Sequence, residues 1–503
     1  MKRLRSTVYL LWVPFFIAIN LSAFYTCKPR TLAVGEVRVV FWAWLTWAPS
    51  EAEVQNAVAA VNAKAIFLRA GQFDLKNGEV ERIRPALGDV PKTTEVHFVY
   101  NGTSKFLNEF EGTDTGKLAG TVAETYRADL ERARKNNVEV GGLQLDLDVP
   151  TRLLPRYAEL LRRVRELLRP ESALSVTGLP TWADSDDIHE VLQAVDFWIP
   201  QCYGAKIPTR VDKHIPISSA TEIERTIAKI RKLEKPFYAG LSAYGYAILY
   251  DENGDLVELR GNIDPDAVIH NSDLELIDKR SFGRGSEPSE VRYEYRAKKG
   301  VVVEGLIIRA RETLVFDVPT SASLRASARA VRENAGSGLL GICLFRLPTA
   351  EDKTTLSLNE IAAALTDKQT TIGADISVER VSERQLRLTA KTTGTADMAY
   401  ADDALTVDLD VPAGSVNGAA AFVGFKAYET LCRSSRIELP RPCSSRRANV
   451  LRLNAASSNP SAAITLNFIT PVPENFHADI TIRASDGRVH RESVDLQIQN
   501  RGE

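Results

Sequence analysis

The sequence predicts an α/β protein, a (β/α)8 TIM barrel followed by an all-β sandwich. Short apolar runs alternate with amphipathic helical runs as far as Leu365, a pattern typical of parallel α/β folds. Eight of these runs read as strands, the number that closes such a barrel. Beyond Lys368 the helical pattern stops, and short alternating runs rich in Thr, Val and Ala are separated by Gly, Pro and Asn. That second pattern is typical of a β-sandwich.

The predicted barrel strands share an apolar composition and a length of six to nine residues. They are Val37–Trp44, Ala63–Ala70, Glu95–Tyr100, Val140–Asp148, Ala173–Leu179, Val195–Tyr203, Phe237–Tyr244 and Gly338–Phe345. Two helix starts carry capping-box spacing, Ser50 with Glu53 and Thr221 with Glu224.

One βα unit is interrupted. Between residues 247 and 319, turn signals such as Asn253-Gly254 separate short strand-like pieces. We therefore expect an insertion of strands and hairpins before the seventh helix, Ser321–Glu333. The resulting domain plan is a barrel over residues 37–366, with the insertion at about 247–319, and a sandwich over residues 369–500.

The composition excludes some classes of partner. The 503 residues include 63 Lys and Arg against 65 Asp and Glu, and no basic stripe is interleaved with aromatic residues. Nucleic acid is therefore not an expected partner. The sequence contains no CxxC pair or histidine cluster, so we expect no metal site and no cofactor. The oligomeric state is not predicted.

The N-terminus reads as a targeting segment. Basic residues in Met1–Arg5 precede an apolar run over residues 8–26, which predicts a signal peptide or a signal anchor within residues 1–30. In either case the rest of the chain is exported, to the periplasm or the cell exterior, and contacts the membrane only through this segment. Cys27 leaves lipidation open as an alternative.

Two of the five cysteines are expected to pair. Cys432 and Cys443 lie eleven residues apart around two prolines, and in an exported chain this spacing favours a disulfide that closes a loop. Cys202 and Cys343 lie inside apolar runs and are interpreted as small buried side chains.

The most informative segment is Gly141–Asp148, which reads Gly-Gly-Leu-Gln-Leu-Asp-Leu-Asp. Because side chains alternate along a strand, Gln144, Asp146 and Asp148 share one face. The carboxyl ends of barrel strands are where active sites form, and two neighbouring carboxylates separate each other's pKa values, which favours one acid. The alternative interpretation is a structural pair held by loop amides or by an arginine.

This segment resembles the signature strand of glycoside hydrolase family 18, Asp-Gly-x-Asp-x-Asp-x-Glu. Gly142 matches the glycine, Asp146 the last aspartate, and Asp148 stands at the glutamate position. Three further segments resemble family motifs in the same order: Asp196–Gly204, Gly240–Gly245, and Gly341–Phe345 after Phe316-Asp317. The chain is most similar to the domain-of-unknown-function 3142 family of such barrels.

The resemblance implies substrate-assisted cleavage of a hexosamine-containing glycan in the cell envelope. By position, Asp148 would be the general acid, Asp146 would orient the substrate's acetamido group, and Tyr203 would donate a hydrogen bond to that group. The chain departs from the family at Asp148, where the side chain is one methylene shorter, and at Gln144, which replaces an acid. A catalytically inactive barrel that binds polysaccharide is therefore the alternative function.

Further side chains at the predicted strand ends are candidates for sugar contacts. Trp42, Trp44, Trp47 and Trp182 cluster near the ends of the first and fifth strands, and Trp44 and Trp182 could stack on sugar rings. Phe345 takes the position of a floor tryptophan in the resemblance. Arg69 and Arg346 could pair with the two aspartates or bind an anionic sugar. The substrate-binding set is then Gln144, Gln201, Trp44, Trp182, Tyr244, Phe345, Arg346 and Arg69.

Overall fold

The computed structural model describes residues 37–44, 48–76, 79–83, 89–204, 206–283, 288–456 and 461–500. The predicted targeting segment, Cys27 and Trp47 lie outside the described residues. Within the described ranges, no helix combines the length and apolar character needed to span a bilayer.

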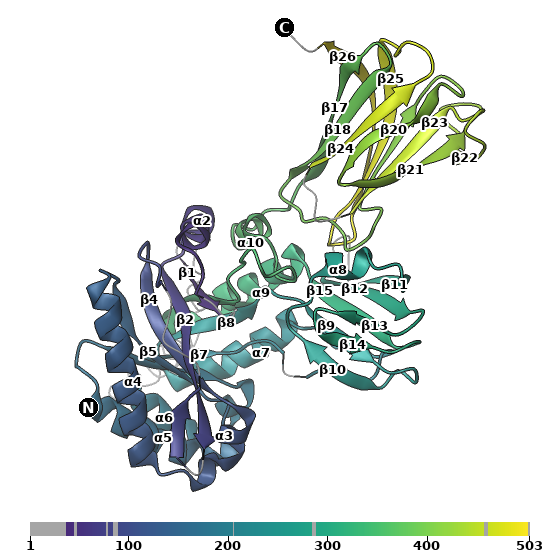
Figure 1. The fold of residues 1–503 in the computed structure, drawn as a ribbon. Helices are drawn as coiled ribbons and strands as arrows, with labels where there is room; N and C mark the ends of the chain where they lie inside the picture. Colours follow the sequence, from purple (N-terminus) through teal and green to yellow (C-terminus); the bar gives the residue numbers. More distant parts are fainter. Residues whose placement is uncertain are drawn as a thin grey trace, which may run out of the picture.

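Eight parallel strands close into the predicted barrel (Figure 1). The first strand pairs in parallel with the second and also with the last, and this double pairing closes the sheet. The barrel strands are β1 (Arg38–Ala43), β2 (Ala65–Lys76), β4 (Glu95–Gly102), β5 (Val140–Asp146), β6 (Ala173–Gly178), β7 (Phe197–Pro200), β8 (Phe237–Ser242) and β16 (Leu339–Phe345). The predicted (β/α)8 fold is confirmed.

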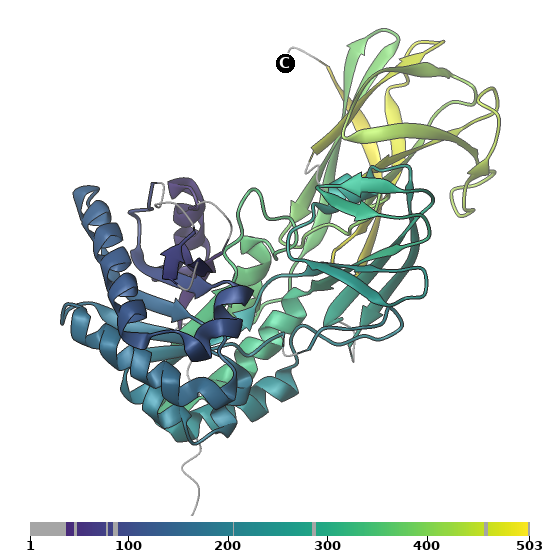
Figure 2. The ribbon, with the colours of Figure 1, turned by 60° about the horizontal axis from the view of Figure 1, so that its bottom comes forward.

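Helices cover the outside of the barrel (Figure 2). They are α2 (Glu51–Val61), α3 (Ser104–Glu109), α4 (Thr115–Lys135), α5 (Leu154–Leu167), α6 (Ile188–Gln193), α7 (Ala220–Ile230), α9 (Ser321–Asn334) and α10 (Leu358–Leu365). The β2–β4 connection carries a short antiparallel strand, β3 (Glu79–Arg82), in its described part. Ser50 and Glu53 form the predicted capping box on α2. The box predicted at Thr221 is wrong, because α7 already begins at Ala220 and its N-cap is Ser219.

The insertion between β8 and α9 forms its own antiparallel sheet. Five strands lie in the order β10-β9-β15-β12-β11, and a separate hairpin, β13–β14, follows β12. The elements are β9 (Tyr246–Tyr250), β10 (Leu256–Arg260), α8 (Pro265–Ile269), β11 (Leu274–Phe282), β12 (Glu290–Ala297), β13 (Val301–Val303), β14 (Leu306–Ile308) and β15 (Thr313–Pro319). The insertion before the seventh helix is therefore present as predicted.

The C-terminal domain is all-β, as predicted. Ten strands are connected in the order β20-β24-β18-β17-β26-β25-β19-β23-β21-β22. They are β17 (Ile372–Ser382), β18 (Gln385–Gly394), β19 (Leu405–Asp410), β20 (Val416–Val423), β21 (Phe425–Cys432), β22 (Arg441–Pro442), β23 (Val450–Ala455), β24 (Ser461–Phe468), β25 (Asn475–Arg483) and β26 (Val489–Asn500). Cys432 and Cys443 form a disulfide, while Cys202 and Cys343 are buried thiols.

The sandwich packs on the insertion rather than on the barrel strands (Figures 1 and 2). Apolar side chains of both parts form one continuous buried cluster. A polar contact crosses the same junction, since the Tyr295 hydroxyl donates to the Tyr400 carbonyl at 2.6 Å. The barrel helix α10 adds a direct contact to the sandwich, where Glu360 accepts from the Asp397 amide at 3.0 Å. The insertion therefore connects the barrel to the sandwich.

Candidate active site at the mouth of the barrel

A pocket of about 200 Å³ opens where several barrel strands reach their carboxyl ends. Its walls combine aromatic rings, two of them phenols, with two carboxylates, one amide and the hydroxyl of a threonine. The lining residues are Trp42, Trp44, Asp146, Asp148, Thr177, Gln201, Tyr203, Tyr244 and Phe345. These residues come from the ends of β1, β5, β6, β7, β8 and β16, so closure of the barrel brings together segments far apart in sequence.

Strand β5 presents both aspartates to this pocket. Leu143, Leu145 and Leu147 point outward into the helix-facing core, so the alternate residues point inward. Asp146 is half-buried at the end of the strand, and Asp148 is exposed two residues further on. The inward carboxylates therefore lie at the mouth, where the cost of burying charge is smallest.

Each carboxylate has a polar neighbour, from the adjacent strand β6 for Asp146 and from the end of β7 for Asp148. The Thr177 hydroxyl donates a hydrogen bond to Asp146 Oδ1. Gln201 Nε2 donates to Asp148 Oδ1 at 3.5 Å, a long and weak contact. Asp146 is thus held by β6, whereas Asp148 is only loosely restrained and keeps access to the pocket.

The environment raises the pKa of both acids. Burial, assisted by the negative charge of Asp148, raises the pKa of Asp146 to about 7, although the Thr177 hydrogen bond and the Arg69 charge oppose the rise. Protein around Asp148 also removes enough water to raise its pKa, against the Gln201 hydrogen bond, even though part of its side chain reaches solvent. Both acids therefore keep their protons to a higher pH than an isolated aspartate would.

Aromatic rings form the floor and one wall of the pocket. Phe345 stacks on Tyr203 with ring centroids 5.8 Å apart and meets the ring of Tyr244 edge-on at 5.0 Å. Trp42 and Trp44 contact Phe345 from the other side, at 6.0 and 5.8 Å. Burial raises the pKa of Tyr244 to about 12 and that of Tyr203 well above its ordinary value, so both phenols remain hydrogen-bond donors. Such a surface suits the apolar face of a sugar ring.

Gln144 does not reach the pocket, which corrects its assignment as a substrate contact. The side chain is fully buried one layer below Asp146, where its Oε1 accepts from Trp42 Nε1 at 2.7 Å. Its Nε2 lies 3.4 Å from the Ser175 hydroxyl. Gln144 therefore positions Trp42, whose ring lines the pocket.

We expect Gln144→Met to lower the free energy of unfolding by about 1–3 kcal/mol, because it leaves the buried Trp42 Nε1–H without an acceptor. The measurement is denaturant unfolding of wild type and variant. Gln193→Met, at an exposed position of α6, is the matched control and should change stability little. Equal stability of Gln144→Met and wild type would contradict the role given to Gln144.

The two arginines behave differently. Arg346 is buried and pairs with Asp352, and it also donates to the Gly261 carbonyl, so the expected pairing with Asp146 or Asp148 is wrong for this residue. Arg69 lies with its guanidinium carbon 4.6 Å from the Trp44 ring centroid and donates through Nε to Asn101 Oδ1 at 3.2 Å. Its positive charge opposes the rise in the pKa of Asp146 but does not cancel it. Arg69 therefore acts on the site electrostatically from behind Trp44.

Trp182 is also not a sugar contact. The indole is fully buried, its Nε1 donates to the Val149 carbonyl at 3.1 Å, and its ring packs against Tyr157. The prediction of stacking is wrong because the turn after β6 directs the indole into the helix-facing core, beneath the loop that carries Asp148. Trp182 anchors that loop.

Two pocket residues were absent from the predicted site, Trp42 and Thr177. Thr177 could have been found from strand parity. Gln144 of β5 pairs with Ser175 of β6, so two residues further along both strands Thr177 lies beside Asp146. Trp42 belongs to the tryptophan cluster noted in the sequence. Its inward direction follows from Val40 and Trp42 sharing the face that fills the barrel interior. In the described part of the chain, no group of His, Cys, Asp or Glu could hold a metal ion.

The part of the chain that contains most of the pocket matches a known protein family. Residues 112–274 match the family described as "Domain of unknown function (DUF3142)". The match confirms the similarity to the domain-of-unknown-function 3142 family. It includes Asp146, Asp148, Thr177, Gln201, Tyr203 and Tyr244. No curated protein matches the sequence.

Several solved structures are similar to the chain in fold alone. A chitinase from Chromobacterium violaceum is 14% identical, covers 66% of this chain and 99% of its own, and has a TM-score of 0.43. The spore cortex-lytic enzyme SleL of Bacillus cereus is 14% identical over 66% of this chain and 74% of its own, with a TM-score of 0.40. A chitinase-like agglutinin from Robinia pseudoacacia is 13% identical over 66% and 99%, with a TM-score of 0.40.

Proposed function

We propose that this chain is a glycoside hydrolase of the cell envelope that cleaves a hexosamine-containing polysaccharide, with Asp148 as the general acid. One observation carries the proposal: Asp148 is exposed inside an aromatic pocket and lies beside Asp146, whose pKa is raised to about 7. A pair of acids with raised pKa values in a sugar-sized, ring-lined pocket fits proton donation near neutral pH.

The roles follow the family 18 resemblance. Asp148 gives its proton to the glycosidic oxygen as the bond from that oxygen to the anomeric carbon breaks. The acetamido oxygen of the same sugar forms the new bond to that carbon, and water later replaces it and returns a proton to Asp148. Asp146, held by Thr177, orients the acetamido nitrogen. Tyr203, whose raised pKa keeps the phenol protonated, donates to the acetamido oxygen.

The remaining pocket residues would bind the sugar. Trp44, Tyr244 and Phe345 offer ring faces and edges, and Gln201 offers an amide beside Asp148. Trp42, fixed by Gln144, extends the aromatic wall. These contacts bind the ring without requiring charge, so they suit a neutral hexosamine.

An envelope location is consistent with two features. The basic, then apolar N-terminal segment of the sequence is typical of export. The disulfide between Cys432 and Cys443 forms and persists in oxidising compartments. Periplasmic or extracellular placement, with residues 8–26 as cleaved leader or anchor, is part of the proposal.

The second candidate function is a catalytically inactive barrel that binds polysaccharide. It is favoured by Asp148, which is one methylene shorter than glutamate, and by Gln144, which cannot exchange a proton with Asp146 and is occupied by Trp42. A shift of about an ångström in a reacting group can cost on the order of a hundredfold in rate.

Purified protein without residues 1–30 separates the two functions. It would be tested against chitin, peptidoglycan and a hexosamine exopolysaccharide, with hydrolysis and binding measured on each. Cleavage that Asp148→Asn removes while binding remains supports the hydrolase. Binding without cleavage, equal in wild type and Asp148→Asn, supports the inactive barrel.

The pH dependence of cleavage gives a further prediction. A general acid must carry its proton, and a raised pKa keeps that proton bound until the pH approaches the raised value. We therefore expect kcat/KM to hold at acidic pH and to fall only as the pH rises through the pKa of Asp148, which burial raises above the ordinary range of an aspartate. The measurement is the pH profile of kcat/KM. A fall centred near pH 4, the range of unperturbed carboxyls, would contradict the assignment.

A further inference from the structure

The loop after β21 exposes apolar side chains to an unusual degree. Ile437 is 96% exposed and Leu439 is 86% exposed, more than any other large hydrophobic residue in the described ranges. Single exposed aliphatic residues are common on soluble proteins. Two that project from one loop, each almost wholly in water, form an apolar tip that needs a covering partner.

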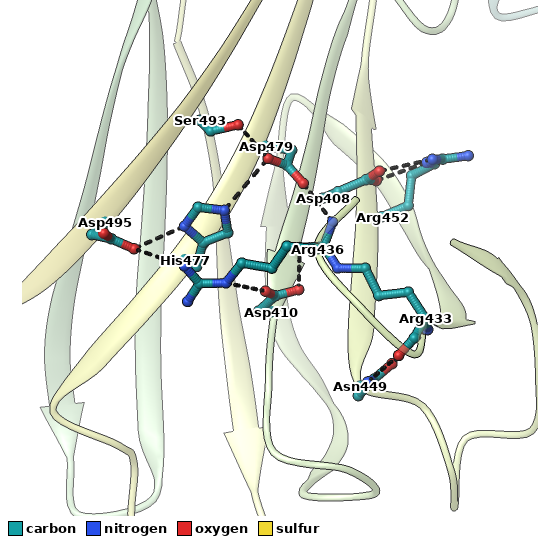
Figure 3. Close-up of polar contacts among 10 residues, drawn as sticks. All are labelled: Asp408, Asp410, Arg433, Arg436, Asn449, Arg452, His477, Asp479, Ser493 and Asp495. Atoms are coloured by element: carbon teal, nitrogen blue, oxygen red, sulfur yellow. Dashed lines mark hydrogen bonds and ion pairs between the residues drawn. The ribbon is translucent and has the colours of Figure 1, made fainter. Parts of the chain in front are cut away.

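This loop is fixed to the sandwich. The Cys432–Cys443 disulfide closes its base. Arg433, whose side chain is 4% exposed, pairs with Asp410 of β19 and Asp479 of β25, each at 2.5 Å (Figure 3). Its backbone exchanges hydrogen bonds of 2.9 and 2.8 Å with the Asn449 side chain. The apolar tip is therefore held in position by covalent and charged contacts.

Arg436 adds longer contacts to the same side. It lies 3.9 Å from Asp410 and 3.8 Å from Asp495, and in Figure 3 its side chain points back over the sheet. Arg433 and Arg436 thus attach the loop to the strands of the sandwich.

Three other arginines of this segment do not attach the loop to the sheet. Arg441, Arg446 and Arg447 are exposed, and none makes an ion pair with a described residue. Glu438 is the one acid among residues 432–447, against five arginines. Arg441, Arg447 and Leu439 also line a groove of about 690 Å³ beside the disulfide. The guanidinium groups of Arg441 and Arg447 and the side chain of Leu439 therefore lie around one groove, which Glu438 also lines. Ile437 and Arg446 are their near neighbours in the sequence, whereas the chain as a whole has a net charge of −2.

We propose that this surface docks on a membrane that contains anionic phospholipid. Ile437 and Leu439 would enter the boundary between headgroups and acyl chains, and Arg441, Arg446 and Arg447 would bind lipid phosphates. Charge complementarity selects an anionic surface, and the aliphatic tip selects one with an apolar interior. A soluble polyanion would satisfy the arginines but leave Ile437 and Leu439 in water. The inference is independent of the proposed hydrolase.

Vesicle co-sedimentation of the purified protein without residues 1–30 tests the proposal. We expect binding to vesicles of equal parts phosphatidylglycerol and phosphatidylcholine, and little binding to pure phosphatidylcholine. The triple variant Arg441→Ala/Arg446→Ala/Arg447→Ala should bind on the order of a hundredfold more weakly, since each surface arginine contributes about fivefold. Ile437→Ser/Leu439→Ser should weaken binding by roughly tenfold or more, because apolar insertion is lost.

Two matched variants control for general surface effects. Val302→Ser/Ile307→Ser removes another exposed aliphatic pair, 64% and 65% exposed, from the β13–β14 hairpin. Arg387→Ala removes an exposed arginine of β18. Both should bind vesicles as wild type does. Hydrolysis of soluble glycan should be the same in all these variants, which separates this test from that of the barrel.

Several results would overturn the proposal. Absence of binding to the anionic vesicles would do so. So would binding that is unchanged in Ile437→Ser/Leu439→Ser and is fully competed by a soluble polyanionic polysaccharide, which would indicate a polymer ligand. Self-association in sedimentation velocity that disappears in Ile437→Ser/Leu439→Ser would instead assign the loop to an interface between two copies.

Discussion

Asp148→Asn is expected to lower kcat/KM for cleavage of a hexosamine polysaccharide by a factor of about 10²–10⁴, the usual contribution of a positioned general acid. Asparagine keeps the shape of the side chain and cannot release a proton to the glycosidic oxygen. The contact with Gln201 is long, so its change disturbs the fold little. Affinity for the glycan should remain within a few-fold, because the aromatic walls are untouched.

Steady-state kinetics and a separate binding measurement check this expectation. Asp186→Asn is the matched control, an exposed aspartate in the turn after β6 whose side chain does not line the pocket. It should leave both rate and affinity unchanged. A rate for Asp148→Asn close to that of wild type would remove Asp148 from the chemistry.

Asp317→Ala is expected to lower the free energy of unfolding by about 3–5 kcal/mol. Arg292 and Asp317 face each other across β12 and β15, are 1% and 0% exposed, and make two hydrogen bonds of 2.7 and 2.8 Å. Removing the carboxylate leaves a buried, charged guanidinium without its partner. Arg292 also donates to the carbonyls of Val211 and Lys213 at 2.9 and 3.1 Å, so the segment that follows Tyr203 should loosen as well.

Chemical denaturation of wild type and three variants measures the change in the free energy of unfolding. The double variant Arg292→Met/Asp317→Leu should lose much less stability than Asp317→Ala, since it removes both charges together. Glu190→Ala breaks an ion pair with Arg162 that is about half exposed on each side, and should cost under about 1 kcal/mol. If Asp317→Ala were no worse than Glu190→Ala, the buried pair would not hold the insertion together.

Strand parity and the alternation of strands and helices predicted much of this architecture. The eight barrel strands, the insertion and the sandwich could be predicted because each depends on local periodicity. The same parity places Asp146 and Asp148 on the inner face at the end of β5, since alternation along a strand does not depend on distant partners.

The predictions that were wrong concern how deep a side chain lies in the barrel and which way it points. Gln144 has the right parity but lies two residues earlier, which is about 6–7 Å deeper in the barrel. Arg346 stands at a strand end, yet Asp352 in the following loop captures it. Trp182 lies in a turn that directs the indole into the helix-facing core instead of the pocket. Each outcome depends on a tertiary partner that sequence periodicity does not specify.

The comparison that tests the account most directly uses two substrates with different leaving groups. Asp148→Asn and wild type would be assayed on an oligosaccharide that the chain cleaves and on the nitrophenyl glycoside of the same sugar, whose leaving group departs without a proton. We expect Asp148→Asn to lose about 10²–10⁴ in kcat/KM on the oligosaccharide and less than about tenfold on the nitrophenyl glycoside. An equal loss on both substrates, or no loss on either, would contradict the assignment of Asp148 as the general acid.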